Sequence, residues 1–213
     1  MQIIYGGKTK ACLPKFDKKE GGFPKEFSLS FNLKHYSNEQ EALKHLDEVI
    51  IPYVTKERER LNNPEQIALL IMDVFKGQMT DAVLTKLHEN KILLEKVPAN
   101  FTYLFQPLDA QGGPNVFSKQ FMRKKFTQWY SSEVIRRIHA GQSVDTIDIK
   151  FRLTAIKPRH AVWLKELYNY MTSPTGKEIV MKGWTVTGIY RSVQNNFPLL
   201  TLLLILILYM MMV

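Results

Sequence analysis

The sequence predicts an α/β fold in which helices flank a small sheet. Segment 67–72 is an uninterrupted apolar run, which is typical of a central strand buried on both faces. A helical pattern follows over 80–90, and a second apolar strand over 92–97. This strand, helix, strand order indicates a parallel unit, whose functional groups usually lie beyond the carboxyl ends of the strands. A long, basic helical segment then begins at Asn115.

Composition is that of an ordinary globular chain with a basic surface. The 213 residues suffice for one domain with a sizeable core, and 45% hydrophobic content excludes a disordered or fully membrane-embedded class. A formal net charge of +9 favours an anionic partner such as nucleic acid, although a basic surface kept only for solubility also explains it. The single cysteine excludes an internal disulfide, and the five histidines show no metal-binding spacing.

The first third of the chain contains two short strands and one long helix. Segments 1–5 and 27–32 have the pattern of strands, and the charged, glycine-containing stretch 15–25 between them is expected to be a loop. Capping and acidic residues at 37–41 precede apolar positions at helical spacing as far as Val54. We expect one amphipathic helix there, with a bend near Pro52.

The last third is predicted to be helical before it becomes entirely apolar. Segment 98–109 is expected to be an extended connection, followed by helices over 115–139, 159–171 and 176–183. Segment 197–213 then carries no charge over seventeen residues. As a helix it would span roughly 25 Å, slightly less than the ~30 Å hydrocarbon core. A membrane anchor is one interpretation of this tail, and packing on the body or disorder is the other.

Two carboxylates are candidates for chemistry. Asp73 ends the buried strand, and Asp109 follows the neighbouring strand and its loop. Acidic groups converging on one sheet edge suit Mg²⁺ or Mn²⁺, and a pair of such ions can activate a water molecule and stabilise a leaving oxygen in phosphodiester cleavage. The simpler interpretation is that Asp73 begins a turn and Asp109 caps a helix.

The residues around both aspartates resemble a known family. Segments 69–80 (LLIMDVFKGQMT) and 97–109 (VPANFTYLFQPLD), with Asp109 36 positions after Asp73, closely resemble the second and third carboxylate blocks of the DDE superfamily endonucleases. The match is to the pogo and Tigger-like branch, which also gave rise to centromere protein B and the jerky proteins. The resemblance continues through 121–130, 153–160 and 168–184, so it covers the chain from Met1 to about Ile189.

The resemblance implies a partial ribonuclease H-like fold, a mixed sheet flanked by helices, with a helical C-terminal extension. It implies three acidic residues that bind two Mg²⁺ or Mn²⁺ ions, hydrolyse a transposon end and join its 3′-hydroxyl to target DNA. Asp73 and Asp109 would be the second and third of these residues and the metal ligands. The first aspartate and the helix-turn-helix region of the family lie upstream of the strand that 1–5 resembles, so both are expected to be absent, and a chain truncated in this way is expected to have reduced metal binding.

The resemblance also suggests boundaries within the chain. Residues 1–140 correspond to the ribonuclease H-like domain without its first strands, 141–190 to a helical extension of that domain, and 191–213 to the apolar tail. Gly112, Gly113 and Pro114 stand where relatives pass directly into a helix, so we expect them to delay that helix and to displace Asp109.

The basic helix is the candidate nucleic-acid surface. Its cationic side chains could follow DNA phosphates, whereas Phe121, Phe126 and Trp129 are spaced more like a core stripe than a platform for base stacking. The residues expected to bind nucleic acid are Lys119, Arg123, Lys124, Lys125, Arg136 and Arg137.

Three functional hypotheses follow. The first is a DNA-binding remnant of a transposase domain in the nucleus, without strand transfer by itself, with DNA and a second copy of the chain as partners. The second is an active metal-dependent endonuclease in which a third carboxylate, such as Glu133 or Asp81, completes the site. The third is a tail-anchored membrane protein, located at a membrane through segment 197–213.

Overall fold

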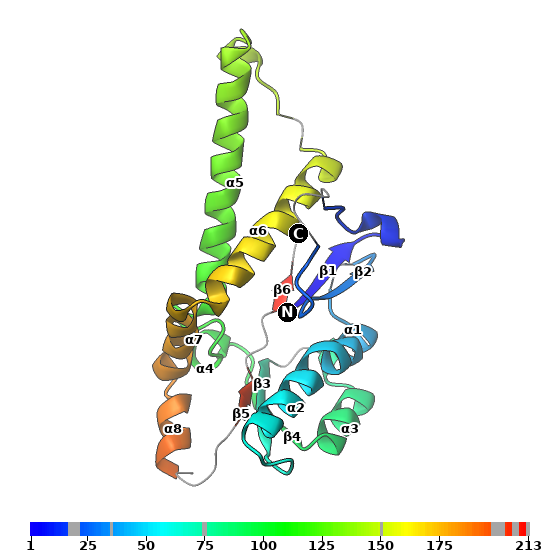
Figure 1. Ribbon diagram of the computed structural model, residues 1–213, viewed down its shortest axis with the longest axis vertical. Coiled ribbons are helices and arrows are strands. Elements are labelled where there is room, and N and C mark those ends of the chain that lie inside the picture. The colour runs from blue at the N-terminus through cyan, green and yellow to red at the C-terminus, as the bar shows by residue number, and fades with distance from the viewer. Residues whose placement is uncertain are drawn as a thin grey trace.

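Helices surround two small sheets in the computed structural model (Figure 1). The structure describes residues 1–16, 22–34, 36–73, 76–149, 151–196, 203–205 and 209–211. The predicted α/β class is confirmed. The strands do not form one mixed sheet, however, because every described strand pair is parallel and the strands divide into two separate sheets.

The first sheet has the order β2-β1-β6. Strand β1 (Gln2–Gly6) pairs with β2 (Ser28–Asn32) on one side and with β6 (Tyr209–Met211) on the other. Side chains alternate between the two faces of a strand, so Ile3 and Tyr5 of β1 point to the same face. Both pack with Leu164 in one buried cluster. The two strands expected near the N-terminus are confirmed.

The second sheet has the order β4-β3-β5 and is covered on both faces. Strand β3 (Ala68–Asp73) lies between β4 (Ile92–Val97) and β5 (Leu203–Ile205). The side chains of Ala68, Leu70 and Met72 belong to one buried cluster, and Leu69 and Ile71 belong to another. This division explains why segment 67–72 is apolar at every position rather than at alternate ones.

Helices α1 (Glu39–His45), α2 (Ile51–Arg60) and α3 (Asp81–Glu89) cover one face of β3 and β4. The side chain of Asn38 caps α1 by accepting a hydrogen bond from the amide of Glu41 at 2.9 Å. A π-helical turn, Leu46–Ile50, joins α1 to α2. The π-helical turn lies just before Pro52, which has no backbone N–H to donate to the preceding turn. The expected long helix is therefore present, and its distortion is close to Pro52.

The C-terminal helices cover the other face and extend from the body. They are α4 (Thr102–Phe105), α5 (Pro114–His139), α6 (Leu153–Thr172), α7 (Pro174–Val186) and α8 (Ile189–Asn196). Helix α4 interrupts the connection that was expected to be extended. Helix α6 begins six residues earlier than expected. It continues through Pro158, because a proline near the start of a helix removes only one backbone hydrogen bond. Figure 1 shows α5 extending well beyond the other elements.

The apolar tail is described only in part. Residues 203–205 and 209–211 form β5 and β6, and the rest of segment 197–213 lies outside the described residues. Among the helices in the described ranges, none is long and apolar enough to cross a membrane. The membrane hypothesis therefore falls largely on residues that the structure does not describe.

Gly183 allows α7 to approach the loop in front of α5. A Cβ atom at this position would overlap the carbonyl oxygen of Pro107 and would lie 3.3 Å from Cδ of Pro114. The next residue, Trp184, is only 3% exposed and packs with Ile71 and Val97. Together these two residues attach α7 to the strand pair and to the loop before α5.

Replacing Gly183 with alanine should therefore destabilise the fold. We expect Gly183→Ala to lower the free energy of unfolding by about 1 to 3 kcal/mol, because the added methyl group meets backbone that cannot move freely. Urea unfolding followed by circular dichroism would measure this. Gly22→Ala is the matched control, because nothing lies within 4 Å of the added carbon, and we expect a change within about 0.5 kcal/mol. Equal stability of Gly183→Ala and the parent would show that α7 does not contact Pro107 this closely.

Candidate functional site

Asp73 and Asp109 lie at the same end of the second sheet. Asp73 is the last residue of β3 and pairs in register with Val97, the last residue of β4. The chain returns from β4 through α4 to Asp109, whose negative charge contributes to a raised pKa of Asp73. This effect of Asp109 on the pKa of Asp73 agrees with the expectation that both residues face the same edge of the sheet.

The Asp109 segment is a compact turn that leads into α5. The amide of Asp109 donates to the carbonyl of Gln106 at 3.0 Å, and the amide of Gly113 donates to the carbonyl of Ala110 at 2.8 Å. Gly112 has φ +74°, a left-handed conformation that glycine adopts without strain. The helix begins only at Pro114, as expected from these residues. The Asn115 side chain then donates to Oδ1 of Asp109 at 2.9 Å and fixes one carboxylate oxygen.

The electrostatics of the pair are unfavourable to two negative charges. Partial burial is the largest cause that raises the pKa of Asp73, the charge of Asp109 is the second, and the backbone amide of Asp73 acts in the opposite direction. A divalent cation between the carboxylates would offset both causes. Mg²⁺ is commonly held by one or two protein carboxylates with water completing its shell, so the pair fits a single hard cation.

The described residues do not complete a three-carboxylate site. Within the described ranges, no group of three or more His, Cys, Asp or Glu side chains is placed to hold a metal ion. Glu133 contacts Arg136 at 2.7 Å and Arg137 at 3.2 Å, and these hydrogen bonds lower its pKa to about 2. It also lies about 28 Å along α5 from the start of that helix. Asp81 is in the first turn of α3, and it forms no three-carboxylate group with the pair in the described ranges.

The six cations expected to bind nucleic acid all lie on α5, in two different states. Lys119, Arg123 and Lys124 are exposed, and no ion pair in the described part of the chain includes them. Lys125 contacts Glu166 of α6 at 2.6 Å, whereas Arg136 and Arg137 both contact Glu133. Exposed ion pairs contribute only about 0 to 1 kcal/mol, so these three cations can exchange a carboxylate for a phosphate with little loss.

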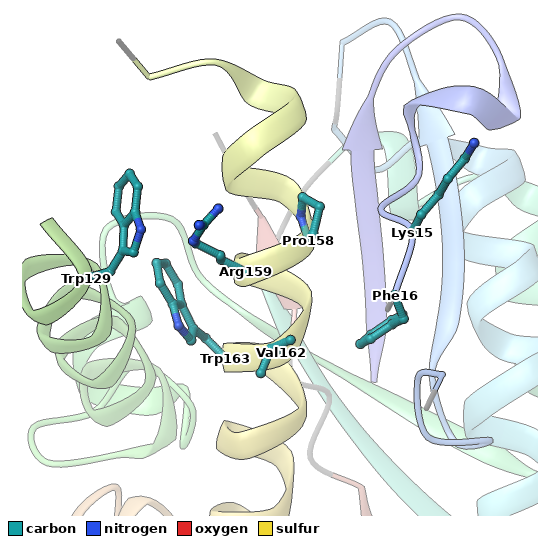
Figure 2. Close-up of a pocket in the computed structure, with 7 residues that line it drawn as sticks. All are labelled: Lys15, Phe16, Trp129, Pro158, Arg159, Val162 and Trp163. Carbon is teal, nitrogen blue, oxygen red and sulfur yellow. The ribbon is translucent and has the colours of Figure 1, made fainter. Parts of the chain in front are cut away.

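A trough beside α5 contains functional candidates that the sequence did not reveal. It encloses about 600 Å³ and is shown in Figure 2. Its lining residues come from three separate segments and include both aromatic and cationic side chains: Lys15, Phe16, Trp129, Pro158, Arg159, Val162 and Trp163. Residues so far apart in the chain give no periodic signal. Arg159 and Trp163, a cation and an aromatic residue about one helical turn apart, are the only sequence signal of this trough.

Substitution of Asp73 should change how stability depends on pH. Because its folded pKa lies above the usual value, this carboxyl stabilises the fold while protonated, and the contribution is lost as pH rises through the folded pKa. Asp73→Asn cannot ionise, so we expect the variant to be more stable than the parent near pH 7 and to lose this advantage near about pH 3. Thermal unfolding across this range would test it, with the exposed Asp148→Asn as control. A constant difference between parent and variant would contradict the assignment.

Comparisons with known proteins identify no relative of this chain. No family model matches it, and no curated protein or solved structure matches it either. The resemblance to the DDE endonucleases therefore stays a prediction from the sequence segments that suggested it.

Proposed function

We propose that this chain is a DNA-binding remnant of a DDE transposase domain, which holds the phosphate backbone with α5 and does not transfer strands by itself. The carrying observation is the cluster formed by Lys119, Arg123 and Lys124, which are exposed within two turns of α5 and engage no acidic side chain in the described ranges. Cations without a protein partner are free to release counterions from DNA, which is the main source of sequence-independent affinity.

The shape of α5 suits contact with a duplex. The helix has 26 residues and is thus ~39 Å long, and its outer half projects from the body (Figure 1). Lys119 and Arg123 are four positions apart and so lie on one side of the helix. Arg136 and Arg137 near its outer end extend the positive charge along the same element. Contacts of this kind position DNA without reading its sequence.

The proposal assigns a reduced role to the carboxylate pair. Transfer of strands by two metal ions needs acidic ligands for both ions, and Asp73 and Asp109 supply ligands for one. The parallel order β3, α3, β4 and the return to Asp109 support a ribonuclease H-like origin, which remains part of the proposal. A nuclear location follows from DNA as the partner and belongs to the same proposal.

One observation favours a second candidate, a metal-dependent nuclease. Asp73 and Asp109 are close enough to interact electrostatically, and such an arrangement is retained in a fold only at some loss of stability. A partner molecule or a second copy of the chain that supplies a third carboxylate would complete the site. This candidate differs from the first in requiring a divalent cation for its effect on DNA.

The first test is titration of the full-length chain against a labelled blunt duplex, over about 50 to 300 mM salt. We expect affinity to fall steeply with salt. The triple variant Lys119→Ala, Arg123→Ala, Lys124→Ala should reduce the slope of log affinity against log salt by between about 2 and 3, because each lost phosphate contact removes about 0.9. Fluorescence anisotropy would measure both slopes.

A matched triple variant separates local contacts from net charge. Arg60→Ala, Lys86→Ala and Lys91→Ala remove three cations that are paired with Glu57, Asp47 and Glu65, and both triple variants lower the formal net charge from +9 to +6. We expect the control variant to keep most of the slope of the parent. Equal losses in the two variants would show that general charge, and not α5, binds the duplex.

The nuclease candidate is tested by incubating the chain with supercoiled DNA and Mn²⁺. As a strand-transfer-deficient remnant, the parent should leave the DNA uncut, and Asp73→Asn should behave identically. Nicking by the parent that disappears in Asp73→Asn and in Asp109→Asn would establish the second candidate instead. Gel electrophoresis gives the readout, and chelation of the metal is the control for dependence on the ion.

A further inference from the structure

The trough beside α5 has a floor and two walls from different parts of the chain. Figure 2 shows Pro158 and Val162 of α6 in the middle, Trp129 of α5 with Arg159 and Trp163 on one side, and Lys15 with Phe16 on the other. Its volume is about 600 Å³, and it is open to solvent along much of its surface.

The aromatic rings around the trough are not packed as a closed core. The ring centres of Trp129 and Trp163 are 6.4 Å apart with their planes tilted by 53°, and Phe151 lies 6.2 Å from Trp129. Trp129 and Trp163, which line the trough, are half-buried. Phe126 and Phe151 pack beside Trp129 without lining the trough, and they are 37% and 51% exposed. The spacing on α5 alone suggested a core stripe, but Phe121 and Trp129 are only half-buried and Phe126 is exposed, so these rings do not form a core stripe.

Positive charge accompanies these rings. The Arg159 guanidinium lies 5.4 Å from the ring centre of Trp129 and donates one hydrogen bond, to the carbonyl of Ala155 at 2.8 Å. Lys15, on the other wall, is exposed. None of the residues that line the described trough is acidic, so no carboxylate opposes an incoming anion. The trough therefore combines two half-buried tryptophans with two cations, of which Arg159 already lies over the ring of Trp129.

We propose that this trough binds a segment of single-stranded DNA, with a base stacked on Trp163 and Trp129 and its phosphates held by Arg159 and Lys15. Aromatic rings beside a positively charged groove are the usual means of binding unpaired strands. Along a duplex the bases stack on each other, so only its two terminal base pairs expose a face. The trough thus selects an unpaired segment, such as an overhang at a DNA end.

The inference rests on the proposed function, since the same helix supplies the duplex contacts. Trp129 and Lys124 are both on α5, so a duplex bound along this helix can place its unpaired end in the trough. The two surfaces use different residues: cations alone on α5, aromatic rings and cations at the trough. Substitutions can therefore separate them.

Intrinsic tryptophan fluorescence of the full-length chain gives a direct measurement. The chain has three tryptophans, and Trp184 is 3% exposed, so Trp129 and Trp163 are the residues whose emission a stacked base can quench. We expect short oligothymidine to quench the fluorescence saturably and a blunt duplex to leave it nearly unchanged. A duplex with a thymidine overhang should bind more tightly than the blunt duplex.

Variants then assign the signal to the trough. Trp163→Leu should weaken oligothymidine binding by about 5- to 100-fold, the range expected for one lost stack, whereas Trp163→Phe should retain most of it. Neither should change affinity for blunt duplex. The matched control Lys119→Ala with Arg123→Ala should weaken duplex binding and leave the fluorescence quenching by oligothymidine in place.

The outcomes distinguish this inference from the proposed function. Duplex binding without quenching and without overhang preference would overturn the inference and leave the proposed function intact. Quenching by oligothymidine without duplex binding would support the trough and overturn the proposed function. If thymidine monophosphate competes as well as the oligomer at equal concentration, the trough is a mononucleotide site, and the single-strand assignment is wrong. If the chain binds no nucleic acid and a protein partner covers Trp163 instead, both the inference and the proposed function are overturned.

Discussion

The contact between Gly183 of α7 and the backbone of Pro107 holds the loop that carries Asp109 and leads into α5. Gly183 lets two backbones meet, and Trp184 beside it inserts into the apolar face formed by Ile71 and Val97. Truncating a buried aromatic of this size removes about 3 to 5 kcal/mol. Helix α7 thereby holds the loop that carries Asp109 against the strand that carries Asp73, although the three elements are far apart in the sequence.

The same junction sets the direction of α5. Pro114 opens this helix and is fully buried, so its first turn is fixed against the body. Phe117 then stacks on Tyr170 of α6 with ring centres 4.8 Å apart. Beyond these contacts α5 carries mainly polar and cationic residues, and its outer turns depend on helix propensity and on pairs such as Glu133 with Arg137. Its middle turns contact α6 through Lys125 with Glu166 and Trp129 with Trp163, so only the turns beyond Tyr130 present charge at a distance from the core.

The sequence predicted individual strands and helices better than the way in which they pair and pack. Continuous hydrophobicity identified β3, and alternation with α3 identified β4, because burial on both faces leaves a strong local pattern. The late start of α5 followed from its glycines and Pro114. The division into two sheets was not predictable, since it depends on which strands pair across long separations. The trough escaped prediction for the same reason, because Phe16, Trp129 and Trp163 share no periodicity.

Two features of this fold are unfavourable for an isolated protein. The negative charge of Asp109 raises the pKa of Asp73 at the end of the sheet, and the trough holds two cations and two half-buried tryptophans with no acidic residue among its described lining. A divalent cation would relieve the first feature, and a phosphate next to a base would relieve the second. The proposed binding of nucleic acid, which carries associated cations, would therefore act on both features.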